Sequence, residues 1–194
     1  MSPFPRGRVF TLPGLFGSGP EHWQTRWELQ HGFARVEQAS WAEPSREAWT
    51  EQLARVLTAQ RAPVFLIAHS LGCALLAHAA SRPELRARIA GALLVAPADV
   101  DDPVRTPALI RGFAPLPSAP LGIRATLVAS RDDPFLTFTR ATQLAAMWQA
   151  QLVDAGAAGH INAESGLGDW PAGLGLLAAL IDHVAAAESG QSTG

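Results

Sequence analysis

Ser70 is the residue with the clearest chemical potential in this chain. It follows the continuously apolar run 64–68 and precedes a stretch of strong helix formers at 71–80. The sequence therefore places Ser70 at a tight turn between a buried strand and a helix. Such a turn strains the serine backbone and lifts its hydroxyl above the sheet edge, as in a nucleophile elbow. The local pattern is A-H-S-L-G at residues 68–72, so Ala68 stands where many such turns have glycine.

A serine hydroxyl becomes a good nucleophile only when a base accepts its proton, and the base needs a carboxylate to orient it. Of the six histidines, His160 is the best candidate base, because it lies in a late loop of small residues that can approach Ser70. The acid comes from the neighbouring pair Asp132 and Asp133, and we favour Asp133 because Pro134 fixes its direction. Three aspartates after an earlier strand are weaker alternatives: Asp99, Asp101 and Asp102.

Attack by Ser70 on a carbonyl carbon also requires two N–H groups that face the developing negative charge. The N–H of Leu71, directly after the serine, is one candidate. The second should come from the glycine-rich loop 13–19, from either Leu15 or Phe16. These backbone groups together predict an oxyanion hole.

Residues around this centre should form a substrate pocket. His69 precedes the serine and should either shape the pocket or pair with the backbone. Trp23 and Trp41 could line an apolar acyl pocket together with the proline-rich segment 97–122. That segment shows no clean periodicity, and its length is typical either of a binding loop or of a packed surface crossover.

The elements that must position these residues alternate along the chain. Six apolar runs predict strands near residues 8–12, 33–37, 64–68, 89–96, 125–129 and 151–153. Helical patterns fall between them, near 20–31, 45–59, 71–80, 137–149 and 171–187. This alternation predicts one α/β domain over residues 1–188, with a mostly parallel six-stranded sheet covered by helices on both faces. Residues 189–194 should form a flexible C-terminal tail.

The amino-acid composition argues against several classes of function. The 194 residues are 48% apolar and 16% charged, with a net charge of −2 and no basic run, so nucleic-acid binding is not expected. The single cysteine, Cys73, excludes an internal disulfide, and no cysteine and histidine spacing suggests a metal site. No apolar stretch reaches the length of a membrane span and no secretory signal is visible, so we expect a cytoplasmic protein.

Four motifs in chain order resemble one known family. They are the loop from Leu12 to Gly14 with the H-W-Q sequence at 22–24, the A-H-S-L-G turn, the S-R-D-D-P-F loop at 130–135, and G-H-I-N at 159–162. The chain resembles the YdeN-like, retinoblastoma-binding-protein-like small serine hydrolases of the α/β-hydrolase superfamily. That resemblance spans nearly the whole chain. It implies that Ser70 is the nucleophile, Asp133 the acid and His160 the base, and that ester or amide bonds are hydrolysed without a cofactor.

Three functions remain open on these observations. The first is a carboxylesterase-like serine hydrolase that cleaves a small-molecule ester, thioester or amide through an acyl-enzyme on Ser70. The second is nucleotide binding at the glycine-rich loop, but the spacing of its glycines does not match a dinucleotide or phosphate-binding motif. The third is a catalytically idle protein-interaction module on a hydrolase fold.

Overall fold

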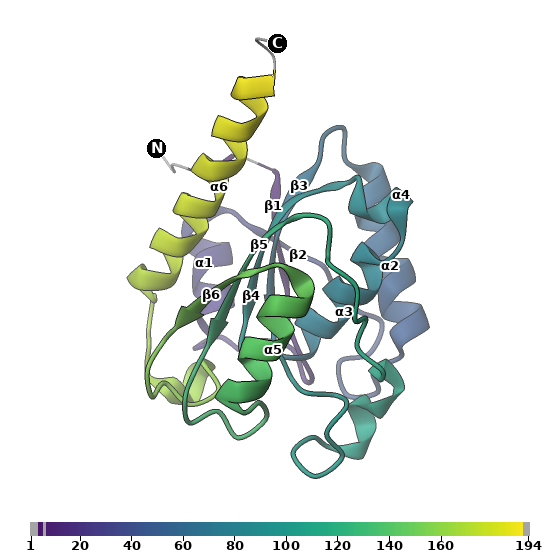
Figure 1. Ribbon diagram of the computed structural model, residues 1–194, viewed down its shortest axis with the longest axis vertical. Helices are drawn as coiled ribbons and strands as arrows, with labels where there is room; N and C mark the ends of the chain where they lie inside the picture. The colour runs from purple at the N-terminus through teal and green to yellow at the C-terminus, as the bar shows by residue number, and fades with distance from the viewer. Residues whose placement is uncertain (1–3, 6, 192–194) are drawn as a thin grey trace.

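Six parallel strands form one sheet in the computed structural model, which describes residues 4–5 and 7–191 (Figure 1). The strand order is β2-β1-β3-β4-β5-β6. The strands are β1 (Val9–Leu12), β2 (Ala34–Arg35), β3 (Val64–His69), β4 (Ile89–Val95), β5 (Arg124–Ala129) and β6 (Gln151–Asp154). The chain moves outward from β1 to β2, then crosses back to β3 and continues outward to β6. The order therefore reverses between β1 and β3, which is where α/β sheets usually bind their ligands.

Helices cover both faces of this sheet, as the sequence predicts (Figure 1). One face carries α1 (Trp23–His31) and α6 (Pro171–Gln191). The other carries α2 (Arg46–Ala59), α3 (Leu71–Ala80) and α5 (Phe138–Trp148). The short helix α4 (Pro83–Arg86) follows α3, and two 3-10 helices, η1 (Ala108–Phe113) and η2 (Ala163–Ser165), lie in loops. No helix in the described ranges 4–5 and 7–191 is long and apolar enough to cross a membrane.

The central strand β3 explains why its sequence is apolar without interruption. Leu66 and Ala68 pack into the cluster beneath α2, α3 and α5. Phe65 and Ile67 pack into the opposite cluster beneath α1 and α6. Because successive side chains of a strand point to opposite faces, a strand buried on both sides must be apolar at every position. This central position fixes the end of β3, and therefore Ser70, relative to the sheet.

Three predicted boundaries were wrong. The edge strand β2 is only two residues long, because only Ala34 and Arg35 pair with β1. Helix α1 begins at Trp23 rather than near residue 20, because the His22 side chain caps it by accepting a hydrogen bond from the Gln24 N–H. Helix α6 continues to Gln191, so residues 189–191 are not a tail, and residues 192–194 lie outside the described part of the chain.

Ion pairs with helix α5 hold the start of the proline-rich segment 97–122. Arg140 of α5 forms ion pairs with Asp99 at 3.2 Å and with Asp101 at 2.7 Å. Within the segment, residues 108–113 form the 3-10 helix η1. Since both carboxylates are engaged by Arg140, Asp99 and Asp101 are not positioned as partners of His160.

Candidate active site

Ser70 occupies a strained turn between β3 and α3. Its backbone lies at φ 54° and ψ −120°, a conformation that L-residues rarely adopt. Two glycines permit the close packing around it. A Cβ atom on Gly14 would lie 2.8 Å from the Ser70 Cβ, and one on Gly72 would collide with the Leu12 carbonyl oxygen. The predicted strand-turn-helix geometry is therefore present, and its strain is maintained by the backbone packing of three segments.

The structure brings Ser70, His160 and Asp133 together in one hydrogen-bonded chain. The His160 Nε2 lies 2.9 Å from the Ser70 Oγ, and its Nδ1 lies 3.0 Å from each oxygen of Asp133. A carboxylate accepts hydrogen bonds, so Nδ1 carries the ring hydrogen and Nε2 is left to accept from the serine hydroxyl. This arrangement can transfer the hydroxyl proton to the imidazole and stabilise the resulting positive charge.

The loop after β5 separates the roles of its two neighbouring aspartates. Asp133 points inward, with its side chain 1% exposed, and also accepts a hydrogen bond from the Phe135 N–H at 2.9 Å. Asp132 instead accepts from the Ser130 hydroxyl at 2.6 Å and from the Gly159 N–H at 2.8 Å. These bonds lower the pKa of Asp132. Asp132 therefore holds the backbone beside His160, while Asp133 reaches the imidazole itself.

Two buried side chains hold the loop that carries His160. The His69 Nε2–H donates to the His160 carbonyl at 3.0 Å, and the Trp23 Nε1–H donates to the Ile161 carbonyl at 2.7 Å. Ile161 has φ 49°, so the loop is strained where the indole holds it. The prediction for His69 allowed pairing with backbone, and the structure shows that pairing. The loop is thus fixed from β3 and from α1.

The two candidates for the second oxyanion donor can be separated by their partners. The Phe16 N–H donates to the Trp41 carbonyl at 2.9 Å, so the Phe16 alternative is wrong. The N–H groups of Leu15 and Leu71 make no hydrogen bond with any residue that the structure describes. Both residues line the cavity above Ser70, and the Leu71 nitrogen lies close to Gly14. Leu15 and Leu71 therefore present two free donors beside the serine.

A cavity of about 420 Å³ opens over the serine. Its walls are largely apolar, with contributions from Leu15, Phe16, Ala98, Pro107, Ile110 and Phe135. The prediction of Trp23 and Trp41 as pocket residues was wrong, whereas His69 does line the cavity. Trp23 is 1% exposed and packs against Trp27 and Trp170, and Trp41 packs over Gly17 and against Trp49. Indole rings at these positions stabilise the core and loops that surround the cavity.

Comparison with known proteins identifies the family. A model of the serine hydrolase family matches residues 9–179. The chain belongs to this family. The serine hydrolase is similar to the crystal structure of a putative YdeN-like hydrolase from Pectobacterium atrosepticum, with a TM-score of 0.82 and 36% identity over 91% of each chain. The predicted resemblance to YdeN-like serine hydrolases, and the α/β-hydrolase fold, are therefore confirmed.

More distant structures share the fold of this serine hydrolase. The ydeN gene product from B. subtilis has a TM-score of 0.73 and 22% identity, over 90% of this chain and 98% of that one. A thioesterase domain from the curacin biosynthetic pathway has a TM-score of 0.60 and 16% identity, over 90% of both chains. No curated protein matches the sequence. At these identities the two structures support the fold alone.

Two further imidazoles of the hydrolase lie beside His160, and burial keeps both neutral. The His69 ring lies 4.9 Å from the His160 ring and 4.7 Å from the His22 ring, measured between centroids. Burial, with a smaller effect of the neighbouring imidazoles, holds the pKa of His69 well below its usual range. Burial and the nearby Arg35 charge lower the pKa of His22 to about 4. At neutral pH neither ring adds a positive charge that would oppose protonation of His160.

Sequence reasoning missed several residues of this hydrolase site. Pro107 and Ile110 line the cavity from the segment 97–122, which was recognised as a possible binding loop without individual residues. Glu164 lines the cavity from η2, and its position soon after His160 was an unused signal. The structural role of the Trp23 N–H has no signal in the sequence, because its partner Ile161 is remote along the chain.

Proposed function

We propose that this serine hydrolase cleaves a small-molecule ester through an acyl-enzyme formed on Ser70. In this proposal His160 is the general base and general acid, and Asp133 orients and stabilises its imidazole. The hydrogen-bonded chain from Ser70 through His160 to Asp133, lying at the bottom of an apolar cavity, is the observation that carries the proposal. The family match and the strained backbone of Ser70 support it.

The reaction proceeds in two halves that use the same groups. The Ser70 Oγ attacks the ester carbonyl carbon while the His160 Nε2 takes the hydroxyl proton. The tetrahedral intermediate collapses, the bond to the leaving oxygen breaks, and that oxygen receives the proton from His160 as the alcohol departs. His160 then removes a proton from water, the hydroxide attacks the acyl carbon, and the acid leaves as Ser70 regains its proton.

The negative charge of each intermediate falls on the former carbonyl oxygen. In our proposal the Leu15 and Leu71 N–H groups donate to that oxygen, since neither has another partner among the described residues. Both belong to turns that are held by close backbone packing around Gly14. Donors that are already oriented require little reorganisation as the charge develops, and losing one generally costs about a hundredfold in rate or more.

The walls of the cavity support a neutral substrate with an apolar acyl group. Pro107 and Ile110 from the segment 97–122 line the cavity together with Leu15 and Phe16 from the first loop. Among the described residues that line the cavity, Glu164 is the only acidic residue and none is a lysine or arginine. A substrate with its own carboxylate would therefore find no cation there and one repulsive charge.

A fluorophosphonate probe tests the nucleophile directly, because it forms a covalent bond only with an activated serine. We expect rapid labelling of the parent protein, no labelling of Ser70→Ala, and much slower labelling of His160→Gln. Parallel unfolding curves establish that each variant is folded. Failure of the folded parent protein to react would refute the proposal and support the alternative of an idle interaction module.

Matched substrates then test the bond and the acyl group. The same butyryl group is presented as an ester, a thioester and an amide, and we expect the highest kcat/KM for the ester. Across p-nitrophenyl acetate, butyrate, octanoate and palmitate, we expect a maximum at butyrate or octanoate, because the cavity is apolar but of limited volume. A higher kcat/KM for the thioester or the amide would show that the proposed ester bond is wrong. A maximum at palmitate would contradict the expectation that the volume of the cavity limits the acyl chain.

A further inference from the structure

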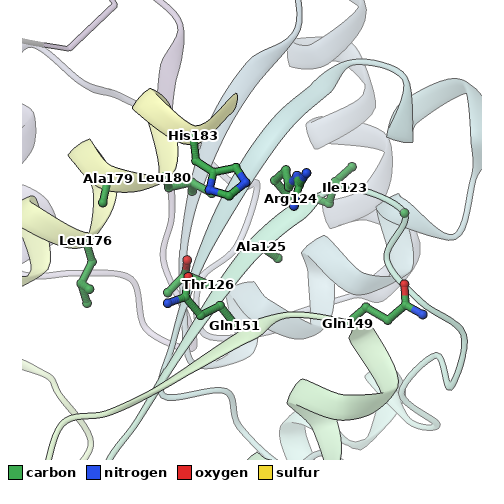
Figure 2. Close-up of a pocket in the computed structure, with 11 residues that line it drawn as sticks. Ile123, Arg124, Ala125, Thr126, Gln149, Gln151, Leu176, Ala179, Leu180 and His183 are labelled. Atoms are coloured by element: carbon green, nitrogen blue, oxygen red, sulfur yellow. The ribbon is translucent and has the colours of Figure 1, made fainter. Parts of the chain in front are cut away.

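A second cavity lies at the end of the sheet opposite to the candidate active site. It has a volume of about 610 Å³, which is within the usual range for small-molecule sites. Its floor is formed by the first residues of β5 and β6, and its wall by α6 (Figure 2). Ser70, in contrast, follows the last residue of β3. Since all strands are parallel, their amino ends and carboxyl ends lie on opposite edges, so the two cavities are separate.

The floor of this second cavity is polar although the sheet face around it is apolar. Along β5, Arg124 and Thr126 share a face with Val128, and Val128 packs in the apolar cluster beneath α6. Thr126 is only 5% exposed, yet its hydroxyl makes no hydrogen bond with any described residue. That hydroxyl oxygen is accessible from the cavity, so it can form a hydrogen bond with a polar atom of a ligand seated there. Gln151 of β6, which pairs with Thr126 in register, adds an amide beside it.

The same cavity is lined by one arginine, Arg124, which is exposed and has no acidic partner among the described residues. The Arg124 side chain makes no ion pair or hydrogen bond with any part of the chain that the structure describes. Arg86 lies beside the lining residue Gly122, where a Cβ atom would be 3.3 Å from the Arg86 Nε. His183 of α6 faces the same hollow as Arg124 (Figure 2). None of the described residues that line the cavity is an aspartate or glutamate.

Apolar side chains complete the wall on the α6 side. Leu176, Ala179 and Leu180 line the cavity from successive turns of this helix. A ligand seated there would therefore meet the Arg124 guanidinium and hydrogen-bonding groups at one part and aliphatic surface at another. We propose that this cavity binds a small amphiphilic carboxylate, with its carboxylate at Arg124 and Thr126 and its hydrocarbon part against α6. A single guanidinium matches the charge and the two oxygens of a carboxylate.

Isothermal titration calorimetry with sodium octanoate tests this site without depending on catalysis. We expect Arg124→Gln to weaken octanoate binding by about tenfold or more, because it removes a charge-assisted hydrogen bond. Ala179→Phe should also weaken binding, because its new ring would fill the cavity from an exposed position of α6. Octan-1-ol, which has the same chain without the charge, should bind about tenfold more weakly than octanoate.

Two controls separate this cavity from the rest of the molecule. Arg61→Gln removes an exposed arginine outside the cavity, and Ala185→Phe adds a ring at an exposed position of α6 that does not line it. Both should bind octanoate like the parent protein. The proposal is overturned if octanoate does not bind, if the alcohol binds equally well, or if Arg124→Gln and Ala179→Phe leave binding unchanged. The last result would place octanoate elsewhere, such as the cavity over Ser70.

Discussion

Trp23→Phe is the most informative single substitution, because Trp23 does not line the cavity and yet contacts the loop that carries His160. Phenylalanine keeps most of the aromatic surface but lacks the N–H that donates to the Ile161 carbonyl at 2.7 Å. Ile161 is fully buried, so no water can readily replace that donor. Leaving such a carbonyl unpaired costs about 1–3 kcal/mol. The loop can lower this cost by moving, and movement displaces His160 from Ser70.

The expected effect is therefore on the chemical step. If the cost is relieved by displacing the imidazole, the acylation rate should fall by on the order of tenfold to a hundredfold, since about 1.4 kcal/mol corresponds to tenfold. The KM for a p-nitrophenyl ester should change little, because Trp23 itself does not line the cavity. Stopped-flow release of p-nitrophenol measures the acylation rate, and urea unfolding measures the accompanying loss of stability.

Trp27→Phe is the matched control. Trp27 is fully buried on the same helix, and its indole N–H donates at 2.7 Å to the carbonyl of Asp169, which lies beyond η2 and next to α6 rather than beside His160. Both variants should lose similar stability, but only Trp23→Phe should lose most of its acylation rate. An equal loss of rate in the two variants would refute the reasoning, because it would show a general effect of weakening the tryptophan cluster.

Three further predictions concern the two aspartates, His22 and Gly72. Asp133→Asn should lower kcat by about a thousandfold or more, whereas Asp132→Asn should lower it by at most about tenfold, as measured by ester hydrolysis at saturating substrate. The pKa of His22 is lowered from 6.5 to about 4, so between these pH values the unfolded chain binds a proton that the folded protein does not. His22 should therefore account for a fall of about 3 kcal/mol in the free energy of unfolding as pH falls through that window. His22→Gln should remove this part in urea titrations, whereas the part that belongs to His69, whose pKa is also lowered, should remain. Gly72→Ala should destabilise the fold by more than about 3 kcal/mol because its Cβ meets the backbone of β1, whereas Gly175→Ala on α6 has open space and should be neutral or stabilising in thermal unfolding.

Much of the fold could be predicted because the relevant signals are local. A continuous apolar run followed by helix-forming residues defines β3 and α3, and the turn between them needs no distant partner to be recognised. The boundary of α1 was less predictable, because its N-cap is an imidazole rather than one of the usual capping residues. The end of α6 was misjudged because Gly190 was expected to lie in a tail, while the helix continues through it.

The sequence likewise predicted some features of the candidate site and not others. The order of Ser70, Asp133 and His160, and the position of each after a strand, were visible in the sequence and led to the correct grouping. The choice between Leu15 and Phe16 could not be made from the sequence, because it depends on the Trp41 carbonyl, which accepts a hydrogen bond from the Phe16 N–H. The pocket tryptophans were misassigned for a similar reason, since spacing shows which side chains share a helix face but not what that face meets.

By itself the sequence determined the parallel α/β architecture, the strained serine turn and the loops that bring Ser70, Asp133 and His160 to one edge. These features follow from the periodicity of apolar residues and from turn chemistry, which act over a few neighbouring positions. Only the tertiary structure decided which N–H groups remain free, which walls enclose each cavity, and that Trp23 holds the loop of His160. Those outcomes depend on the distance and direction of contacts between remote segments, and packing of the whole chain sets both.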